Sequence, residues 1–178
     1  MSTYVAFLRG INVGGHRRIK MAELRQAFES WGFQKVKTLL ATGNVVFESP
    51  KTDAQSLTQS IEEKLKATFG YEIDVILRTI EQIQELVDSN PFKAIEVTPD
   101  TRLYVTFLSD KPNSRLKIPY ESPDRDYKIL DVADGAVYSV LTLAANTRST
   151  DAMAILGKEF GKKITTRNWN TITKIVKS

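Results

Sequence analysis

VKTLLATGNVVFES, residues 36–49, contains two strand-like runs separated by a turn signal. Residues 36–41 and 45–49 are rich in Val, Leu and Phe, and the pair Gly43-Asn44 between them is typical of tight β-hairpins. Two strands joined so closely pair in the antiparallel direction. This hairpin lies in the middle of the first half of the chain. The elements on each side of it indicate which fold the half adopts.

A helical pattern lies on each side of the hairpin. Residues 21–32 and residues 52–70 each carry apolar side chains at helical spacing, and each stretch ends in a glycine, which often stops a helix. The second stretch opens with Thr52-x-x-Gln55, the pattern of a capping box. The apolar positions are Met21, Leu24, Phe28, Trp31, Leu57, Ile61 and Leu65.

Two further apolar runs, residues 4–9 and 71–78, predict a strand before the first helix and a strand after the second. The first half therefore reads strand, helix, strand, strand, helix, strand. A second helix signal, residues 79–82, then opens a connector helix. It ends at Asn90-Pro91, because the residue before a proline avoids helical ψ, and residues 91–101 follow as a linker.

The second half repeats this order of elements without obvious residue identity. Residues 111–124 contain three prolines, which favour an irregular crossover over a helix. Asp134-Gly135 is the strongest hairpin signal in the chain. The expected strands are residues 102–108, 126–132, 136–144 and 162–166, and the expected helices are residues 149–161 and 169–177.

This order predicts an α/β (α+β) chain of two ferredoxin-like βαββαβ units with antiparallel-mixed sheets, joined by a helical connector. We expect the first unit at residues 1–79, the connector helix and linker at residues 80–101, and the second unit with its C-terminal helix at residues 102–178.

The composition excludes several classes of protein. The 178 residues are 42% apolar and include no cysteine, which excludes disulfides and thiol chemistry. No apolar run approaches the roughly 20 residues that cross a bilayer, and the N-terminus does not read as a signal peptide. We therefore expect a cytoplasmic protein that does not contact membranes. The single histidine, His16, reads as a solvated loop residue, so we expect no metal site.

LRGINVGG, residues 8–15, follows the first strand and is rich in glycine and basic neighbours. In a βαββαβ unit the first and third strands pair, so this loop lies beside the turn at residues 42–44. Glycines let backbone N–H groups approach an anion. The candidate ligand-binding residues here are Arg9, Asn12, Gly14, Gly15, Thr42 and Asn44.

TTRNWNT, residues 165–171, spans the end of a strand and the start of a helix. Thr166 or Asn168 can cap that helix, yet the stretch holds more hydrogen-bonding groups than a cap requires. Arginine offers a planar fork suited to phosphate or carboxylate. The candidate ligand-binding residues here are Arg167, Asn168, Trp169, Asn170 and Lys174.

These stretches resemble the bacterial domain-of-unknown-function family 1697. The resemblance rests on LRGINVGG at residues 8–15, Met21, TGN at residues 42–44, NPF at residues 90–92 and TRNWNT at residues 166–171. Thr42 stands where the family usually has serine, and both residues offer a hydroxyl. The resemblance implies a ferredoxin-like α/β fold and no particular activity.

The sequence predicts that the two motifs line a cleft between the units and bind a small anionic ligand that carries a phosphate or a nucleotide. Arg9 and Arg167 are expected to bind the anion, and Gly14 and Gly15 to donate backbone N–H groups. The amides of Asn12, Asn44 and Asn170 are expected to orient the ligand, and Trp169 to stack on a flat part of it.

Two alternatives stay open at this point. The chain could be a nucleic-acid-binding module, although the usual aromatic signature of the commonest such fold is missing. It could also be a non-enzymatic interaction protein whose polar motifs form an internal seam. The sequence names no general base and no cofactor, so it leaves open whether a reaction is catalysed. It is equally compatible with a monomer and a homodimer.

Overall fold

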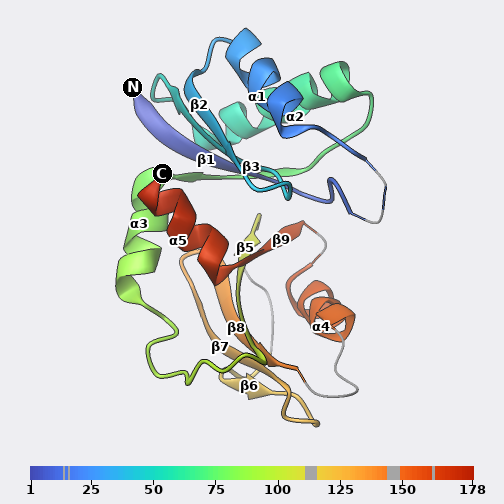
Figure 1. Cartoon of the computed structure of the whole chain (residues 1–178), viewed down its shortest axis with the longest axis vertical. Helices are drawn as coiled ribbons and strands as arrows, with labels where there is room; N and C mark the ends of the chain where they lie inside the picture. The colour runs from blue at the N-terminus through green and yellow to red at the C-terminus, as the bar shows by residue number, and fades with distance from the viewer. Residues whose placement is uncertain (14, 16, 111–115, 144–148, 162) are drawn as a thin grey trace. The chain divides into compact units, whose positions relative to one another are not determined.

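The computed structural model shows two compact units (Figure 1). The first comprises Met1–Glu85 and Lys174–Ser178, and the second comprises Leu86–Thr173. Helices α3 (Ile80–Ser89) and α5 (Trp169–Lys177) each contribute residues to both units. The structure describes residues 1–13, 15, 17–110, 116–143, 149–161 and 163–178.

The first unit is built on a four-stranded sheet in the order β2-β3-β1-β4. Every pair of neighbours is antiparallel, so β1 and β2, which both pair with β3, run in the same direction. This is the order of a ferredoxin-like unit, and it confirms that the first and third strands pair. The strands are β1 (Ser2–Leu8), β2 (Gln34–Leu39), β3 (Asn44–Ser49) and β4 (Val75–Thr79).

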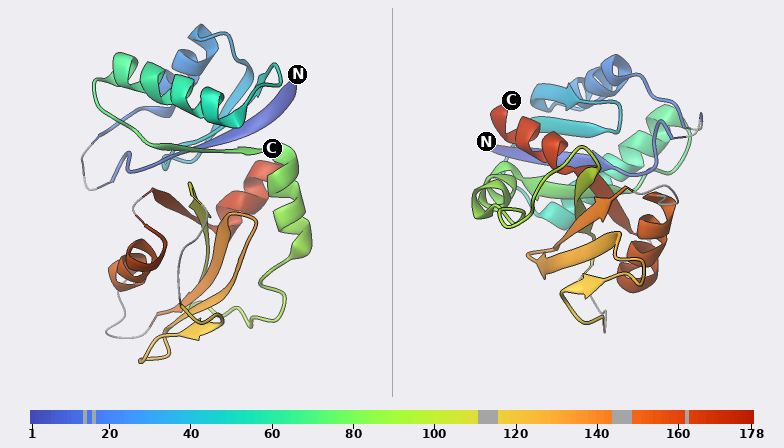
Figure 2. Two further views of the ribbon diagram at one scale, coloured as in Figure 1. Left: turned by 180° about the vertical axis from the view of Figure 1, so that it is seen from behind. Right: turned by 60° about the horizontal axis from the view of Figure 1, so that its bottom comes forward.

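Helices α1 (Met21–Ser30) and α2 (Ala54–Phe69) cover one face of this sheet, as Figure 2 shows from behind. The apolar positions at helical spacing face the strands, which is why the two helices form there. At the centre of this core, Phe47 is fully buried. Its ring centroid lies 4.6 Å from that of Phe33 and 5.4 Å from that of Phe28.

The start of α2 corrects one sequence prediction. The residue that caps α2 is Asp53 and not the predicted Thr52. The Asp53 carboxylate accepts a hydrogen bond from the Ser56 backbone N–H at 2.9 Å. The start of α3 confirms the helix signal at residues 79–82 and shows a capping box there. There the Gln82 N–H donates to the Thr79 hydroxyl at 3.2 Å, and the Thr79 N–H donates to the Gln82 side chain at 2.9 Å.

The Asp53 cap makes the stability of α2 depend on pH. Hydrogen bonds from the backbone N–H and then the hydroxyl of Ser56 hold the pKa of the Asp53 carboxyl below its ordinary value. Because the folded pKa is depressed, the stabilisation is present above about pH 4 and is lost as pH falls through the folded pKa.

Asp53→Asn keeps a capping oxygen that does not titrate. The difference in urea midpoint between wild type and Asp53→Asn should therefore shrink from about pH 6 to about pH 3. A constant difference would contradict this account.

The first hairpin is wider than the sequence suggested. Leu39 pairs with Asn44, so the loop between β2 and β3 consists of residues 40–43, and the tight two-residue turn predicted at Gly43-Asn44 is wrong. Asn44 is the first residue of β3 and is fully buried. Leu40 and Gly43 both have positive φ, 62° and 89°, which lets the longer loop close.

The second unit has a five-stranded antiparallel sheet in the order β6-β7-β8-β5-β9. Four of these strands repeat the order of the first sheet, and β6 is added at the edge. Asp134 and Gly135, both with positive φ, confirm the predicted hairpin between β7 and β8. The elements are β5 (Thr101–Leu108), β6 (Tyr120–Glu121), β7 (Tyr127–Ala133), β8 (Ala136–Thr142), α4 (Ser149–Phe160) and β9 (Ile164–Asn168).

Helix α4 packs on one face of this second sheet, where Ala152 and Leu156 join the buried core. The described residues of the crossover between β5 and β7 contain no helix. The α+β fold class and the two ferredoxin-like units are confirmed. In the described part of the chain, no helix combines the length and the apolar character that a membrane span requires.

Candidate functional site

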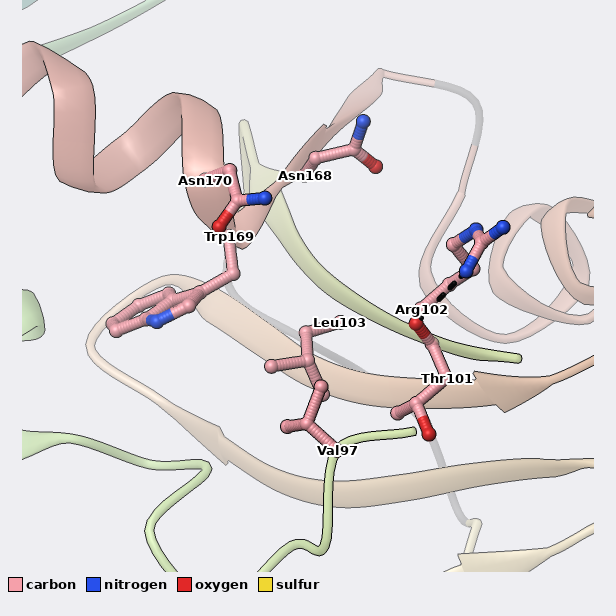
Figure 3. A pocket seen from close by; sticks show the side chains of 7 residues that line it. All are labelled: Val97, Thr101, Arg102, Leu103, Asn168, Trp169 and Asn170. Atoms are coloured by element: carbon pink, nitrogen blue, oxygen red, sulfur yellow. Dashed lines mark hydrogen bonds between the residues drawn. The ribbon is translucent and has the colours of Figure 1, made fainter. Parts of the chain in front are cut away.

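A hollow of about 310 Å³ lies in the second unit, where β5 begins and β9 ends (Figure 3). The antiparallel pairing of β5 with β9 sets Tyr104 opposite Asn168, so the first residues of β5 lie beside the start of α5. The chain changes from strand to helix between Asn168 and Trp169. The residues that line the hollow are Val97, Thr101, Arg102, Leu103, Asn168, Trp169 and Asn170.

Arg102 supplies the positive charge of this hollow. Its Nη1 donates hydrogen bonds to the carbonyl oxygens of Pro99, at 2.8 Å, and Thr101, at 3.1 Å. Within the described residues no carboxylate pairs with this exposed guanidinium. Burial raises the pKa of the Tyr104 phenol, and the charge of Arg102 opposes that rise. Arg102 is thus an anchored cation whose charge is not neutralised by a neighbouring acid.

Asn168 and Asn170 bring two side-chain amides to the same hollow. Both side chains are exposed, and neither amide makes a hydrogen bond within the part of the chain that the structure describes. The predicted capping role is therefore not seen for Asn168. It is not seen for Thr166 either, whose hydroxyl hydrogen-bonds with that of Thr106 at 2.8 Å. The two amides offer donors and acceptors that the fold itself does not use.

Trp169 forms an aromatic wall of the hollow. Its ring packs against Phe92 with centroids 5.1 Å apart and an angle of 70° between the planes. Phe92 is itself buried and packs edge-on against Tyr138. This series of contacts holds the indole in place while part of it stays exposed.

Arg167, the arginine of the same motif, does not line this hollow. It is 7% exposed and its Nη1 donates to the Thr165 hydroxyl at 2.7 Å and to the Thr166 carbonyl at 3.1 Å. Burial lowers the pKa of its guanidinium to about 10, so it keeps its charge at neutral pH. Alternation along β9 turns Arg167 to the face opposite Asn168. Its predicted role as an anion ligand stays a prediction.

The loop after β1 uses its polar groups within the first unit. The Asn12 amide donates to the carbonyls of Ile19, at 3.1 Å, and Ala41, at 2.7 Å, and accepts from the Ile19 N–H at 2.8 Å. The Asn44 amide donates to the Leu39 carbonyl and to the Thr42 hydroxyl. The loop and the hairpin turn therefore meet as the topology predicted, and these amides hold them together.

The remaining candidates are spread over the first unit. Arg9 forms an ion pair with Asp74 at 3.6 Å. Gly15 has a φ of 79°, and Lys174 is exposed on α5 among the residues grouped with the first unit. Gly14 and His16 lie outside the described residues. The ligand-binding roles expected for Arg9, Gly14, Gly15 and Lys174 stay predictions, as does the solvated loop position expected for His16.

A second hollow, of about 480 Å³, lies in the first unit and is also lined by basic side chains. Two of its cations already have acidic partners. Arg25 pairs with Glu29 at 2.9 Å, and Lys35 pairs with Glu48 at 3.3 Å. A third cation, Lys37, also lines it. This larger hollow is the weaker candidate because its lining includes the carboxylate of Glu48 and contains neither an aromatic ring nor a side-chain amide.

Most aromatic side chains of the central strands are buried, and Tyr104 on β5 is partly buried. Tyr4 and Phe7 on β1, Phe47 on β3, Phe107 on β5 and Tyr138 on β8 are all at most 5% exposed. Proteins that read single-stranded nucleic acids on a sheet need exposed aromatics on which bases can stack. This burial argues against such a surface here.

The sequence prediction missed Arg102, although a signal for it was available. In a βαββαβ unit the fourth strand pairs beside the first, so the end of β9 must lie near the start of β5. Arg102 is the charged residue at that start. Strand order placed Arg9 near Asn44 in the first unit. In the same way it places Arg102 near Asn168 in the second unit.

The comparisons with known proteins agree with this architecture. A solved structure of a conserved bacterial protein from Streptococcus pneumoniae matches with a TM-score of 0.72 and 23% sequence identity, over 99% of this chain and 97% of its own. At that identity the likeness shows the fold alone. No curated protein is significantly similar to the chain.

A family profile described as protein of unknown function DUF1697 matches residues 1–138. The matched part contains the motifs at residues 8–15, 42–44 and 90–92 and ends before the motif at residues 165–171. Because the match spans well over half of the chain, this protein belongs to the DUF1697 family.

Proposed function

We propose that this protein is a cytoplasmic binding protein for a small anionic ligand that carries a phosphate, and that the hollow beside Trp169 is the binding site. One observation carries the proposal. An exposed arginine and two side-chain amides lie in one hollow, and among the described residues the arginine has no acidic partner and the amides make no hydrogen bond. These groups are Arg102, Asn168 and Asn170. Three of the lining residues come from the TTRNWNT motif.

The chemistry of these groups suits a phosphate. The guanidinium keeps several N–H donors besides the nitrogen that is bound to the backbone, and it is charged at every physiological pH. Hydrogen bonds between charged partners are roughly twice as strong as neutral ones. The two Nη1 contacts fix one terminal nitrogen of the guanidinium and so restrain the whole planar group, which lowers the entropy lost when a phosphate binds.

The proposal predicts that Arg102→Gln weakens phosphate binding. Removing one charge-assisted hydrogen bond costs about 1.5 kcal/mol or more, which corresponds to roughly a tenfold rise in Kd. Isothermal titration calorimetry with ribose 5-phosphate at low ionic strength measures this directly. Added salt should weaken the wild-type interaction, because it screens the exposed charge.

Arg125→Gln is the matched control for this experiment. Arg125 lies in the same unit, has an 86% exposed side chain and does not line the hollow. Its replacement removes the same charge outside the lining of the hollow and should leave the Kd unchanged. Equal affinities of wild type and Arg102→Gln would refute the assignment of the site.

A further inference from the structure

The two sides of the hollow differ in chemistry. Figure 3 shows the indole of Trp169 on one side and the guanidinium of Arg102 on the other, with the side chains of Val97 and Leu103 between them. A simple anion would need only the charged side. The aromatic side and the apolar floor call for a ligand that carries a flat group at some distance from its charge.

The amides of Asn168 and Asn170 point to the same conclusion. Each presents an N–H₂ donor and a carbonyl acceptor, and neither is engaged within the described residues. A phosphate only accepts hydrogen bonds at its charged oxygens. The carbonyl oxygens of the two amides therefore find no donor on a phosphate. The edge of a nucleobase presents donors and acceptors side by side, which matches an asparagine amide.

Trp169 is suited to stack on a flat ring. Its contact with Phe92, at 70° between the planes, fixes the orientation of the indole before any ligand arrives. Stacking on a tryptophan stabilises a bound base and tolerates any base, because every base has a π-face. A fixed ring loses little entropy on binding.

Size and charge limit the ligand to one phosphate and one base. The volume of about 310 Å³ lies at the lower end of the range for small-molecule sites, roughly 300–1,000 Å³. Of the seven residues that line the hollow, Arg102 alone is charged. A single guanidinium matches one phosphate group, whereas a triphosphate would leave most of its charge unpaired.

We propose that the ligand of this hollow is a nucleoside monophosphate, with its base on Trp169, the edge of that base on Asn168 and Asn170, and its phosphate on Arg102. This inference rests on the proposed function. It specifies the class of ligand. It also implies that the base contributes as much to the affinity as the phosphate does.

The test compares adenosine 5′-monophosphate with ribose 5-phosphate in a Trp31→Phe variant. The chain has two tryptophans, so Trp169 is then the sole indole and its fluorescence reports on the hollow. Trp31 is partly buried beside Phe28, and phenylalanine preserves that aromatic contact. We expect the nucleotide to quench Trp169 and to bind about tenfold more tightly than the sugar phosphate.

Asn170→Ala separates the contribution of the base from the stability of the fold. Asn170 is exposed and its side chain makes no hydrogen bond in the described structure, so the variant should fold as the parent does. It should lose severalfold more affinity for the nucleotide than for ribose 5-phosphate, because only the nucleotide offers a base edge to this amide. Trp169→Phe should reduce the preference for the nucleotide in calorimetry, since a smaller ring stacks less well.

The outcomes distinguish this inference from the proposed function. Equal affinity for the two compounds, unaffected by Asn170→Ala, would overturn the nucleoside monophosphate and leave the phosphate site standing. Failure of both compounds to bind at concentrations up to about 10 mM, which corresponds to a binding free energy weaker than about −3 kcal/mol, would overturn both proposals.

Discussion

Gly43→Ala should lower the free energy of unfolding by about 3 kcal/mol, the largest effect expected from a single methyl group in this chain. Gly43 closes the loop before β3 with a φ of 89°. A Cβ at this position would lie 2.7 Å from Ile11 Cδ1 and 3.0 Å from Leu8 Cβ. Ile11 and Leu8 are both buried, so they cannot move aside without disturbing the core.

The steric part of this effect can be separated from the backbone part. Gly32 and Gly70 also have positive φ, 93° and 85°, but a Cβ at either position meets nothing within 4 Å. Gly32→Ala and Gly70→Ala should therefore cost only the left-handed backbone strain, about 1 kcal/mol. Urea denaturation of the three variants measures all three values. A loss for Gly43→Ala no greater than for the two controls would contradict the close approach of Ile11 and Leu8.

Asn12→Ala should destabilise the first unit by about 2–3 kcal/mol while leaving ribose 5-phosphate affinity unchanged. The side chain takes part in three hydrogen bonds, two to Ile19 and one to Ala41, that hold the loop after β1 to the hairpin turn. Each is worth about 1 kcal/mol when the partner groups are partly buried. Urea denaturation and calorimetry on the same sample measure the two quantities.

Asn12→Gly isolates the hydrogen bonds from the backbone conformation. Asn12 has a φ of 56°, which glycine adopts freely and alanine does not. The glycine variant should thus be less destabilised than the alanine variant. If Asn12→Ala kept its stability but lost phosphate affinity, the loop would belong to the binding site and the structural role argued here would be wrong.

The fold could be predicted from the sequence because each of its signals is local. A helix begins at the signal of residues 79–82, and Asp134-Gly135 forms the predicted hairpin. The pairing of β1 with β3 followed from topology alone. The cap of α2 was misplaced by one residue because Thr52 and Asp53 are both good capping residues, and the local pattern does not rank them.

The candidate site was predicted less completely, because residue type does not reveal whether a polar group is already satisfied. Asn12 and Asn170 look alike in the sequence, yet one amide is engaged in three hydrogen bonds and the other in none that the structure describes. Arg167 was favoured over Arg102 because it stands inside a conspicuous motif. Burial of Arg167 and exposure of Arg102 depend on the packing of the whole unit.

The most direct test of the phosphate site is a nuclear magnetic resonance titration of ¹⁵N-labelled protein with adenosine 5′-monophosphate. We expect saturable shifts of the side-chain amides of Asn168 and Asn170 and of the indole N–H of Trp169, which line the hollow of the second unit. The side-chain amide of Asn12, held in the first unit, should not respond. Shifts centred on Asn12 and its loop, with Asn168 and Asn170 unchanged, would show that the nucleotide binds in the first unit and not in the hollow beside Trp169.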